Sequence, residues 1–287
     1  MTPLLIIMAV LAAAVLLTAV GILGQSWIAM LWVVRINKQT PHPRRPRTGV
    51  FHPAHPVEGE RRTRVLWILG DSLGFGLGVT AAAKAPIHVL GQSLADSSHC
   101  TVRVFNYSRI GSGGRDLAGQ QEDLMQSAER AGAQDPDWVV IVTGANDVVP
   151  VPSRTGAAAR ALGERVQDLT ARGAHVVVAT CPALGAVTAL PRPARTFLHA
   201  AGLRLAARQE KEVHRGGGQV VALHREVSPA VEADPSLLSG DGFHPGDRGY
   251  RLATDKILAR IAQPSLTAQD THQVVPAGAN SRAAAAS

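Results

Sequence analysis

The chain has 287 residues, 46% of them hydrophobic and 18% charged, a composition that excludes a disordered polyelectrolyte and leaves room for one or two globular domains. Its formal net charge is +7, but six of the seven excess positive charges lie between residues 35 and 64. The rest of the chain is therefore close to neutral, which argues against a nucleic-acid-binding surface on the folded part.

The N-terminal segment is apolar almost without interruption from Pro3 to Val34, and residues 1–34 contain no Lys, Arg, Asp or Glu. This segment exceeds the roughly 20 residues that a helix needs to cross a bilayer. It lacks the basic start and the short apolar core of a cleaved signal peptide. We therefore predict a transmembrane helix or signal anchor over residues 1–34. The basic flank favours a cytoplasmic location for the remainder, although large domains also follow such spans to the other side.

The next segment, residues 35–61, combines five prolines with basic residues, a composition typical of an extended linker with little share in a core. The far end, residues 263–287, is rich in Ala, Ser, Gln and Thr and predicts a disordered tail. The folded domain is expected between them, over residues 62–262.

Within that domain, short apolar runs rich in Val and Ile alternate with helical patterns, which indicates βα units and a parallel sheet. Their apolar residues are nearly uninterrupted, so both faces of the sheet should be covered by helices in a three-layer α/β/α sandwich. Ligands in such folds bind beyond the carboxyl ends of the strands. The five predicted strands are Val65–Leu69, Val102–Phe105, Trp138–Thr143, His175–Thr180 and Gln219–Leu223.

Two short motifs directly follow the first and second predicted strands. The first, Gly70-Asp71-Ser72-Leu73, puts a serine on a strand-to-helix turn, where its hydroxyl and its amide can face a ligand. The second is glycine-rich, and either Gly111 or Gly113 can present a backbone amide to an anion. Alone, these motifs are equally explained as a helix cap and a flexible turn.

Two further motifs follow the third and fifth predicted strands. Gly144-Ala145-Asn146-Asp147 holds a carboxamide that can donate to an oxyanion, and the same residues suit an Asx-turn. In Asp241-Gly242-Phe243-His244 the aspartate, three residues before the histidine, can hold the imidazole in one tautomer. A purely structural role, such as a cap or a turn, can explain each motif alone. No one structural role explains all four motifs at one end of a sheet.

Together the four motifs resemble those of the GDSL or SGNH hydrolases, and the resemblance covers about Val65 to Ile261. It implies a flavodoxin-like five-stranded sheet in the order 2-1-3-4-5, and hydrolysis of acyl esters or thioesters without metal or organic cofactor. Carried over residue by residue, it assigns catalysis to Ser72, Asp241 and His244, and the oxyanion hole to Ser72, Gly111 and Asn146. In this carry-over Gly111 matches the spacing from Asn106 best, and Gly113 is the alternative. Asp71 and Asp147 are assigned structural roles, because a carboxylate aimed at an oxyanion would oppose catalysis.

The expected substrate is a small-molecule acyl ester or thioester. The small side chains expected to wall the pocket favour a short acyl group: Val148, Val149, Val151, Leu184 and Val187. Two alternatives stay open on these residues. The acyl group could pass to a sugar or lipid hydroxyl, as in an acyltransferase or deacetylase, or the domain could be a non-catalytic binding module tethered at the membrane.

Overall fold

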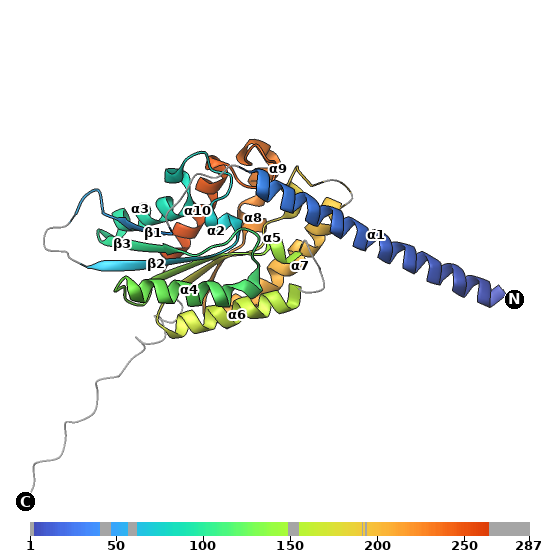
Figure 1. Cartoon of the computed structure of the whole chain (residues 1–287), viewed down its shortest axis with the longest axis horizontal. Helices are drawn as coiled ribbons and strands as arrows, with labels where there is room; N and C mark the ends of the chain where they lie inside the picture. The colour runs from blue at the N-terminus through green and yellow to red at the C-terminus, as the bar shows by residue number, and fades with distance from the viewer. Residues whose placement is uncertain are drawn as a thin grey trace, which may run out of the picture.

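The computed structural model describes residues 3–40, 47–56, 62–148, 155–190, 192 and 194–263. A single six-stranded sheet, in the order β1-β3-β2-β4-β5-β6, lies between two layers of helices (Figure 1). Its strands are β1 (Thr48–Phe51), β2 (Thr63–Gly70), β3 (Thr101–Asn106), β4 (Trp138–Val142), β5 (His175–Ala179) and β6 (Gln219–Val221). The α-helices are α1 (Pro3–Gln39), α2 (Ser72–Phe75), α3 (Pro86–Ser98), α4 (Leu117–Arg130), α5 (Ala145–Val148), α6 (Thr155–Ala171), α7 (Ala194–Arg215), α8 (Leu223–Glu226), α9 (Ser228–Ala233) and α10 (Asp247–Ile261). Short 3₁₀ turns are η1 (Ala82–Lys84), η2 (Gly114–Asp116), η4 (Leu184–Ala186) and η5 (Pro235–Leu237).

The five strands from β2 to β6 are those that the sequence predicts, and they pair in parallel. Their spatial order, β3-β2-β4-β5-β6, is the order 2-1-3-4-5 of the prediction. All of their carboxyl ends therefore meet at one edge of the sheet, where α2 and α5 begin just after β2 and β4.

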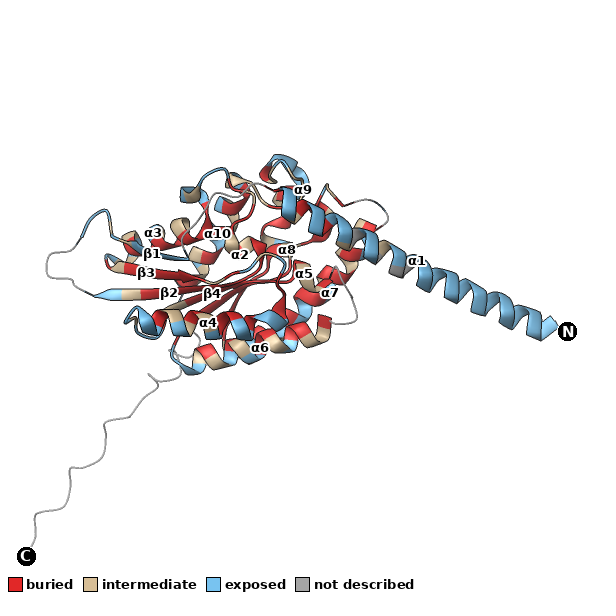
Figure 2. Cartoon of the chain, in the orientation of Figure 1, coloured by how far each residue is buried: buried red, intermediate tan, exposed pale blue. Residues whose placement is uncertain are grey.

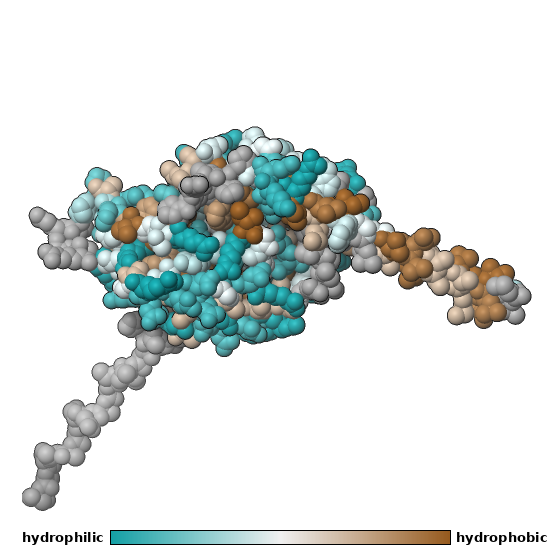
Figure 3. Space-filling model, viewed as in Figure 1, coloured by the Kyte–Doolittle hydropathy of each residue, from teal (hydrophilic) through white to brown (hydrophobic). Residues whose placement is uncertain are grey.

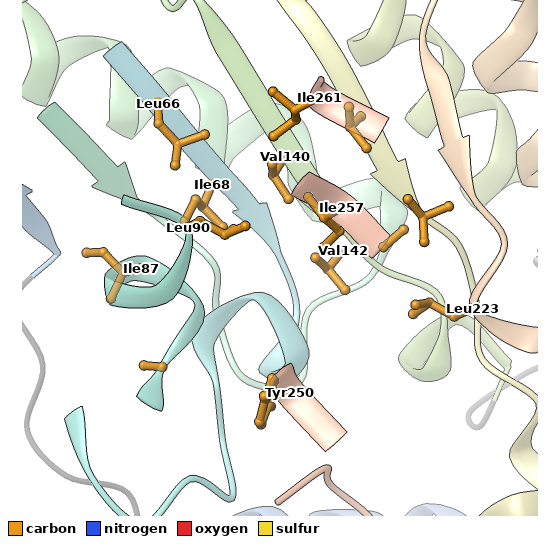
Figure 4. Packing of buried hydrophobic residues seen from close by; sticks show 14 of the residues in the cluster. Leu66, Ile68, Ile87, Leu90, Val140, Val142, Leu223, Tyr250, Ile257 and Ile261 are labelled. Atoms are coloured by element: carbon orange, nitrogen blue, oxygen red, sulfur yellow. The ribbon is translucent and has the colours of Figure 1, made fainter. Parts of the chain in front are cut away.

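Alternating side chains of the strands supply two separate cores. On one face, Leu66 and Ile68 of β2 pack with residues of α3 and α10 (Figure 4). On the other face, Trp67 and Leu69 pack with residues of α4 and α6. Each fully buried side chain of this size contributes about 1.5–3 kcal/mol, so both helical layers are held strongly. The three-layer prediction is confirmed.

The segment predicted as a linker needs a correction, because it contains β1. This strand pairs antiparallel with β3, and Phe51 lies opposite Val102. The Phe51 ring also packs edge-on against His88 of α3 with a centroid distance of 5.5 Å. A proline-rich composition favours extended backbone, and an extended segment beside an open sheet edge completes that edge.

The helix predicted at the N-terminus continues further than expected, since α1 extends to Gln39, whereas its candidate membrane span is shorter than the predicted residues 1–34. Its residues 3–21 form a stretch that is long and apolar enough to cross a membrane, and none of that stretch is buried. Figures 2 and 3 show this exposed, apolar half projecting away from the domain. In the last turns, by contrast, Val33 and Ile36 are buried. The predicted tail after Gln263 lies outside the described residues.

Candidate active site

The turn after β2 holds Ser72 at the first position of α2. Gly70 makes this turn possible, because its φ is +130° and a Cβ there would collide with the carbonyl of Val142. Asp71 caps the short helix by accepting a 2.8 Å hydrogen bond from the Leu73 amide. The backbone therefore fixes where the Ser72 hydroxyl lies.

Three side chains from opposite ends of the domain meet at this turn. The Ser72 hydroxyl lies 3.1 Å from Nε2 of His244, and Nδ1 of His244 lies 2.8 Å from Oδ2 of Asp241. Ser72 and His244 are 172 residues apart in the chain, and both are buried. With Asp241 ionised, Nδ1 carries the proton, so Nε2 is free to accept the hydroxyl proton of Ser72.

Asp241 is held ionised by its hydrogen bonds. Its Oδ1 accepts the amides of Phe243 and His244, both at 2.8 Å, and its Oδ2 also faces the hydroxyl of Thr40 at 2.6 Å. Burial alone would raise the pKa of Asp241, but the bonds from His244, Thr40 and the Phe243 amide hold it well below its usual range. The site therefore keeps a negative charge beside His244 throughout the ordinary pH range.

The loops of the predicted oxyanion donors are fastened to the serine turn. Nδ2 of Asn146 donates to the carbonyl of Ser112 at 2.9 Å, and the amide of Arg109 donates to the carbonyl of Gly70 at 3.0 Å. Between the two glycine candidates, the Gly113 amide already donates to Asp116 at 2.8 Å. Gly111 has a φ of +83°, and its amide has no recorded acceptor in the part of the chain that the structure describes. The geometry therefore favours Gly111 as the donor.

Gln120 is a further structural partner of the site that our sequence analysis missed. This fully buried side chain clamps Gly70 from both sides, accepting from its amide at 2.7 Å and donating to its carbonyl at 2.8 Å. Its amide also lies 2.8 Å from the hydroxyl of Ser112. A signal was present in the sequence: Gln120 lies at helical spacing between Leu117 and Leu124, on the buried face of α4.

Two carboxyl groups, the buried Asp71 and the partly buried Asp147, lie beside the site and make no hydrogen bond to His244 among the described residues. Burial raises the pKa of Asp71 to about 7 and that of Asp147 to about 6. Both oxygens of Asp147 face the Gly114 amide at 3.0 Å, while Asp71 makes the helix cap described above. These contacts agree with the structural roles expected for both residues.

We expect Asp71→Asn to reduce the loss of stability on going from pH 5 to pH 8. The folded protein holds a proton on Asp71 up to about pH 7, whereas the unfolded chain loses it near 3.8, so stability falls as pH rises between these values. Asparagine keeps the acceptor for Leu73 and cannot ionise. Between pH 5 and pH 8 the free energy of unfolding should fall by about 2–3 kcal/mol more in wild type than in Asp71→Asn, at 1.36 kcal/mol per pKa unit. Urea unfolding in detergent at both pH values measures it, and equal losses in the two proteins would contradict the prediction.

An apolar pocket opens beside Ser72 and continues under α10. It is lined by Leu184 and Val187 near the site, and by Ile68, Val140 and Ile257 along the sheet and helix. Ile68 pairs with Val140 in the sheet, two residues before β2 ends, and both side chains also belong to the core that packs against α10.

Of the five residues expected to wall the pocket, Leu184 and Val187 do so. Val148 does not line the pocket, and it packs with Ala159 and Leu205 in a core cluster where α5 contacts α6 and α7. Val149 and Val151 lie outside the described residues.

Comparisons with known proteins agree with this architecture. The family model of the GDSL-like Lipase/Acylhydrolase family matches residues 68–252. A GDSL-like esterase of Mycobacterium tuberculosis is 35% identical over 197 residues, which are 68% of this chain and 61% of that protein. The chain thus spans less than two thirds of that relative's length.

Solved structures share the fold at low sequence identity. The crystal structure of TesA has a TM-score of 0.51 and 20% identity, covering 69% of this chain and 98% of TesA. A lipase/acylhydrolase from Enterococcus faecalis has a TM-score of 0.50 and 21% identity, covering 69% of this chain and 95% of its own.

Proposed function

The chain belongs to the GDSL-like lipase/acylhydrolase family, and from this premise we propose that it is a serine esterase that hydrolyses acyl esters through an acyl-enzyme on Ser72. One observation carries the proposal: Ser72, His244 and Asp241 form a continuous chain of hydrogen bonds beside an apolar pocket. A serine hydroxyl needs an adjacent base to act as a nucleophile at neutral pH, and this arrangement supplies one.

In the proposed reaction Nε2 of His244 takes the proton of Ser72 as its Oγ bonds to the carbonyl carbon of the ester. Asp241 stabilises the imidazolium that forms. His244 then returns the proton to the departing alcohol, which leaves the acyl group on Ser72. A water molecule that gives a proton to His244 attacks this acyl group. The bond to Ser72 then breaks, the acid leaves, and His244 returns the proton to Oγ of Ser72.

The negative charge that develops on the carbonyl oxygen requires donors fixed in advance. We assign this role to the amides of Ser72 and Gly111 and to Nδ2 of Asn146. Hydrogen bonds from Asn146 to Ser112 and from Arg109 to Gly70 hold the three loops together, so little reorganisation is needed during the reaction.

We propose that the apolar pocket binds the acyl group, because Ser72 lies in its wall. Apolar residues continue from this wall to Ile257 of α10. We therefore extend the short-chain expectation and propose acyl chains long enough to reach α10.

The proposal is tested by labelling with a fluorophosphonate probe, followed by a series of nitrophenyl esters from acetyl to decanoyl. We expect labelling at Ser72, and a kcat/KM that rises with chain length beyond acetyl. No labelling at Ser72 would favour a non-catalytic binding domain. Labelling with negligible hydrolysis, restored by added alcohols, would favour an acyltransferase.

A variant inside the pocket makes the chain-length test specific. Ala253 lines the pocket, so Ala253→Leu should reduce activity on the longer esters while sparing the acetyl ester. Lys256 lies on the exposed face of the same helix, and Lys256→Leu serves as the matched control. Equal losses on short and long esters in Ala253→Leu would place the acyl chain elsewhere.

We further propose that α1 anchors the protein in a membrane. Its residues 3–21 are apolar and wholly exposed, an arrangement that water disfavours and a bilayer accepts. Detergent should then extract the intact protein where high salt does not, and release by salt alone would indicate a peripheral attachment.

A further inference from the structure

The end of the apolar helix reaches the proposed catalytic carboxylate. Thr40 follows the last residue of α1, and its Oγ1 lies 2.6 Å from Oδ2 of Asp241, although 201 residues separate the two in the chain. The same Oδ2 accepts the bond from Nδ1 of His244. Thr40 is only 5% exposed, so its hydroxyl is largely shielded from competing water.

Packing, in addition to hydrogen bonding, holds Thr40 beside Asp241. Val33 belongs to a buried cluster with Ala194 and Leu198 of α7, and Ile36 is buried one turn before Thr40. The amide of Thr40 donates to the carbonyl of Ile36 at 2.9 Å, so the residue continues the helical hydrogen bonding. The last two turns of α1 are therefore part of the domain.

The hydroxyl of Thr40 has one proton, and two acceptors lie close to it among the described residues. The carbonyl of Ile36 lies at 2.8 Å and the carboxylate of Asp241 at 2.6 Å. The carboxylate is charged, so it is the stronger acceptor. The other carboxylate oxygen already receives two backbone amides, which leaves Thr40 and His244 as the partners that set the orientation of Oδ2.

We propose that Thr40 is a positioning residue for the Asp241–His244 pair, so that the apolar helix completes the active site in addition to serving as an anchor. This inference rests on the proposed esterase function. Without the hydroxyl, Oδ2 loses a donor and the carboxylate gains freedom to rotate away from Nδ1. The imidazole would then spend less time aligned with Ser72.

The test uses the full chain in detergent. We expect Thr40→Val to lower kcat for nitrophenyl acetate about tenfold, which is ~1.4 kcal/mol of barrier, with KM unchanged. Thr40→Ser keeps the hydroxyl, so its kcat should stay within about twofold of the wild-type value. The matched control is Thr18→Val, because Thr18 makes the same bond to the carbonyl four residues earlier, at 2.7 Å from Ala14, far from Asp241.

A second readout does not depend on turnover. The proton shared by Nδ1 of His244 and Asp241 gives a low-field NMR resonance, assigned by its loss in His244→Ala. We expect Thr40→Val to shift it and Thr40→Ser to leave it in place. An unshifted resonance with wild-type kcat in Thr40→Val, or equal defects in the Val and Ser variants, would overturn the positioning role.

Failure of the inference is distinguishable from failure of the proposed function. If Ser72→Ala is inactive and Thr40→Val is fully active, the esterase stands and the role of Thr40 is overturned. Wild-type turnover in Ser72→Ala would overturn both.

Discussion

Ser72→Ala is expected to lower kcat for ester hydrolysis by about 10⁶-fold, because removing the nucleophile removes the acyl-enzyme route as a whole. His244→Ala should cost about as much, since residues that act as one unit do not contribute additively. Hydrolysis of nitrophenyl acetate by the purified variants, compared with wild type, measures both effects.

Folding should be unaffected in the serine variant. The backbone carbonyl of Ser72 accepts the amides of Gly76 and Leu77, both at 2.9 Å, and alanine preserves these bonds. Among the described residues, the Ser72 side chain makes its hydrogen bond to His244. A thermal midpoint close to wild type, measured by circular dichroism, is therefore the control. Wild-type activity in Ser72→Ala would refute the assignment of the nucleophile.

Asp241→Asn is expected to lower kcat by up to about 10⁴-fold, because the substitution favours the wrong tautomer of His244. Two backbone amides, of Phe243 and His244, donate to Oδ1 of Asp241, and only the carboxamide oxygen of asparagine can accept them. The NH₂ group must then face Nδ1 of His244. The imidazole accepts there and carries its proton on Nε2, where it can no longer take the proton of Ser72.

Asp247→Asn is the matched control for this variant. Asp247 begins α10, three residues after His244, and its oxygens accept the amide and hydroxyl of Thr80. The same change of charge occurs there without contact to the imidazole, so kcat should remain close to wild type. An equal loss of kcat in both variants would indicate a general effect of charge, and the tautomer argument would then be wrong.

Residues close together in the chain could be interpreted well from the sequence. Gly70, Asp71 and Ser72 form one turn, so their spacing already encodes the backbone that presents the serine. Asp241 and His244 likewise contact each other across three residues. The five parallel strands were predictable because burial on both faces leaves a continuous apolar run in each.

Contacts between distant segments could not be read in the same way. Composition favoured a linker over residues 35–61, and the strand β1 within it depends on the open edge of β3, which no local pattern reveals. The sequence shows Gln120 as a polar residue on an apolar helix face. Its partner Gly70 could not be inferred, because it lies 50 residues away in the chain.

The sequence by itself determined the five parallel strands, the family motifs and the apolar N-terminal helix, because each depends on periodicity or on spacing within a few residues. Only the tertiary structure decided that Thr40 meets Asp241, that Gly113 is already committed to Asp116, and that the pocket continues under α10. These depend on how packed layers bring remote segments within hydrogen-bonding or van der Waals distance, and that geometry is a property of the whole fold.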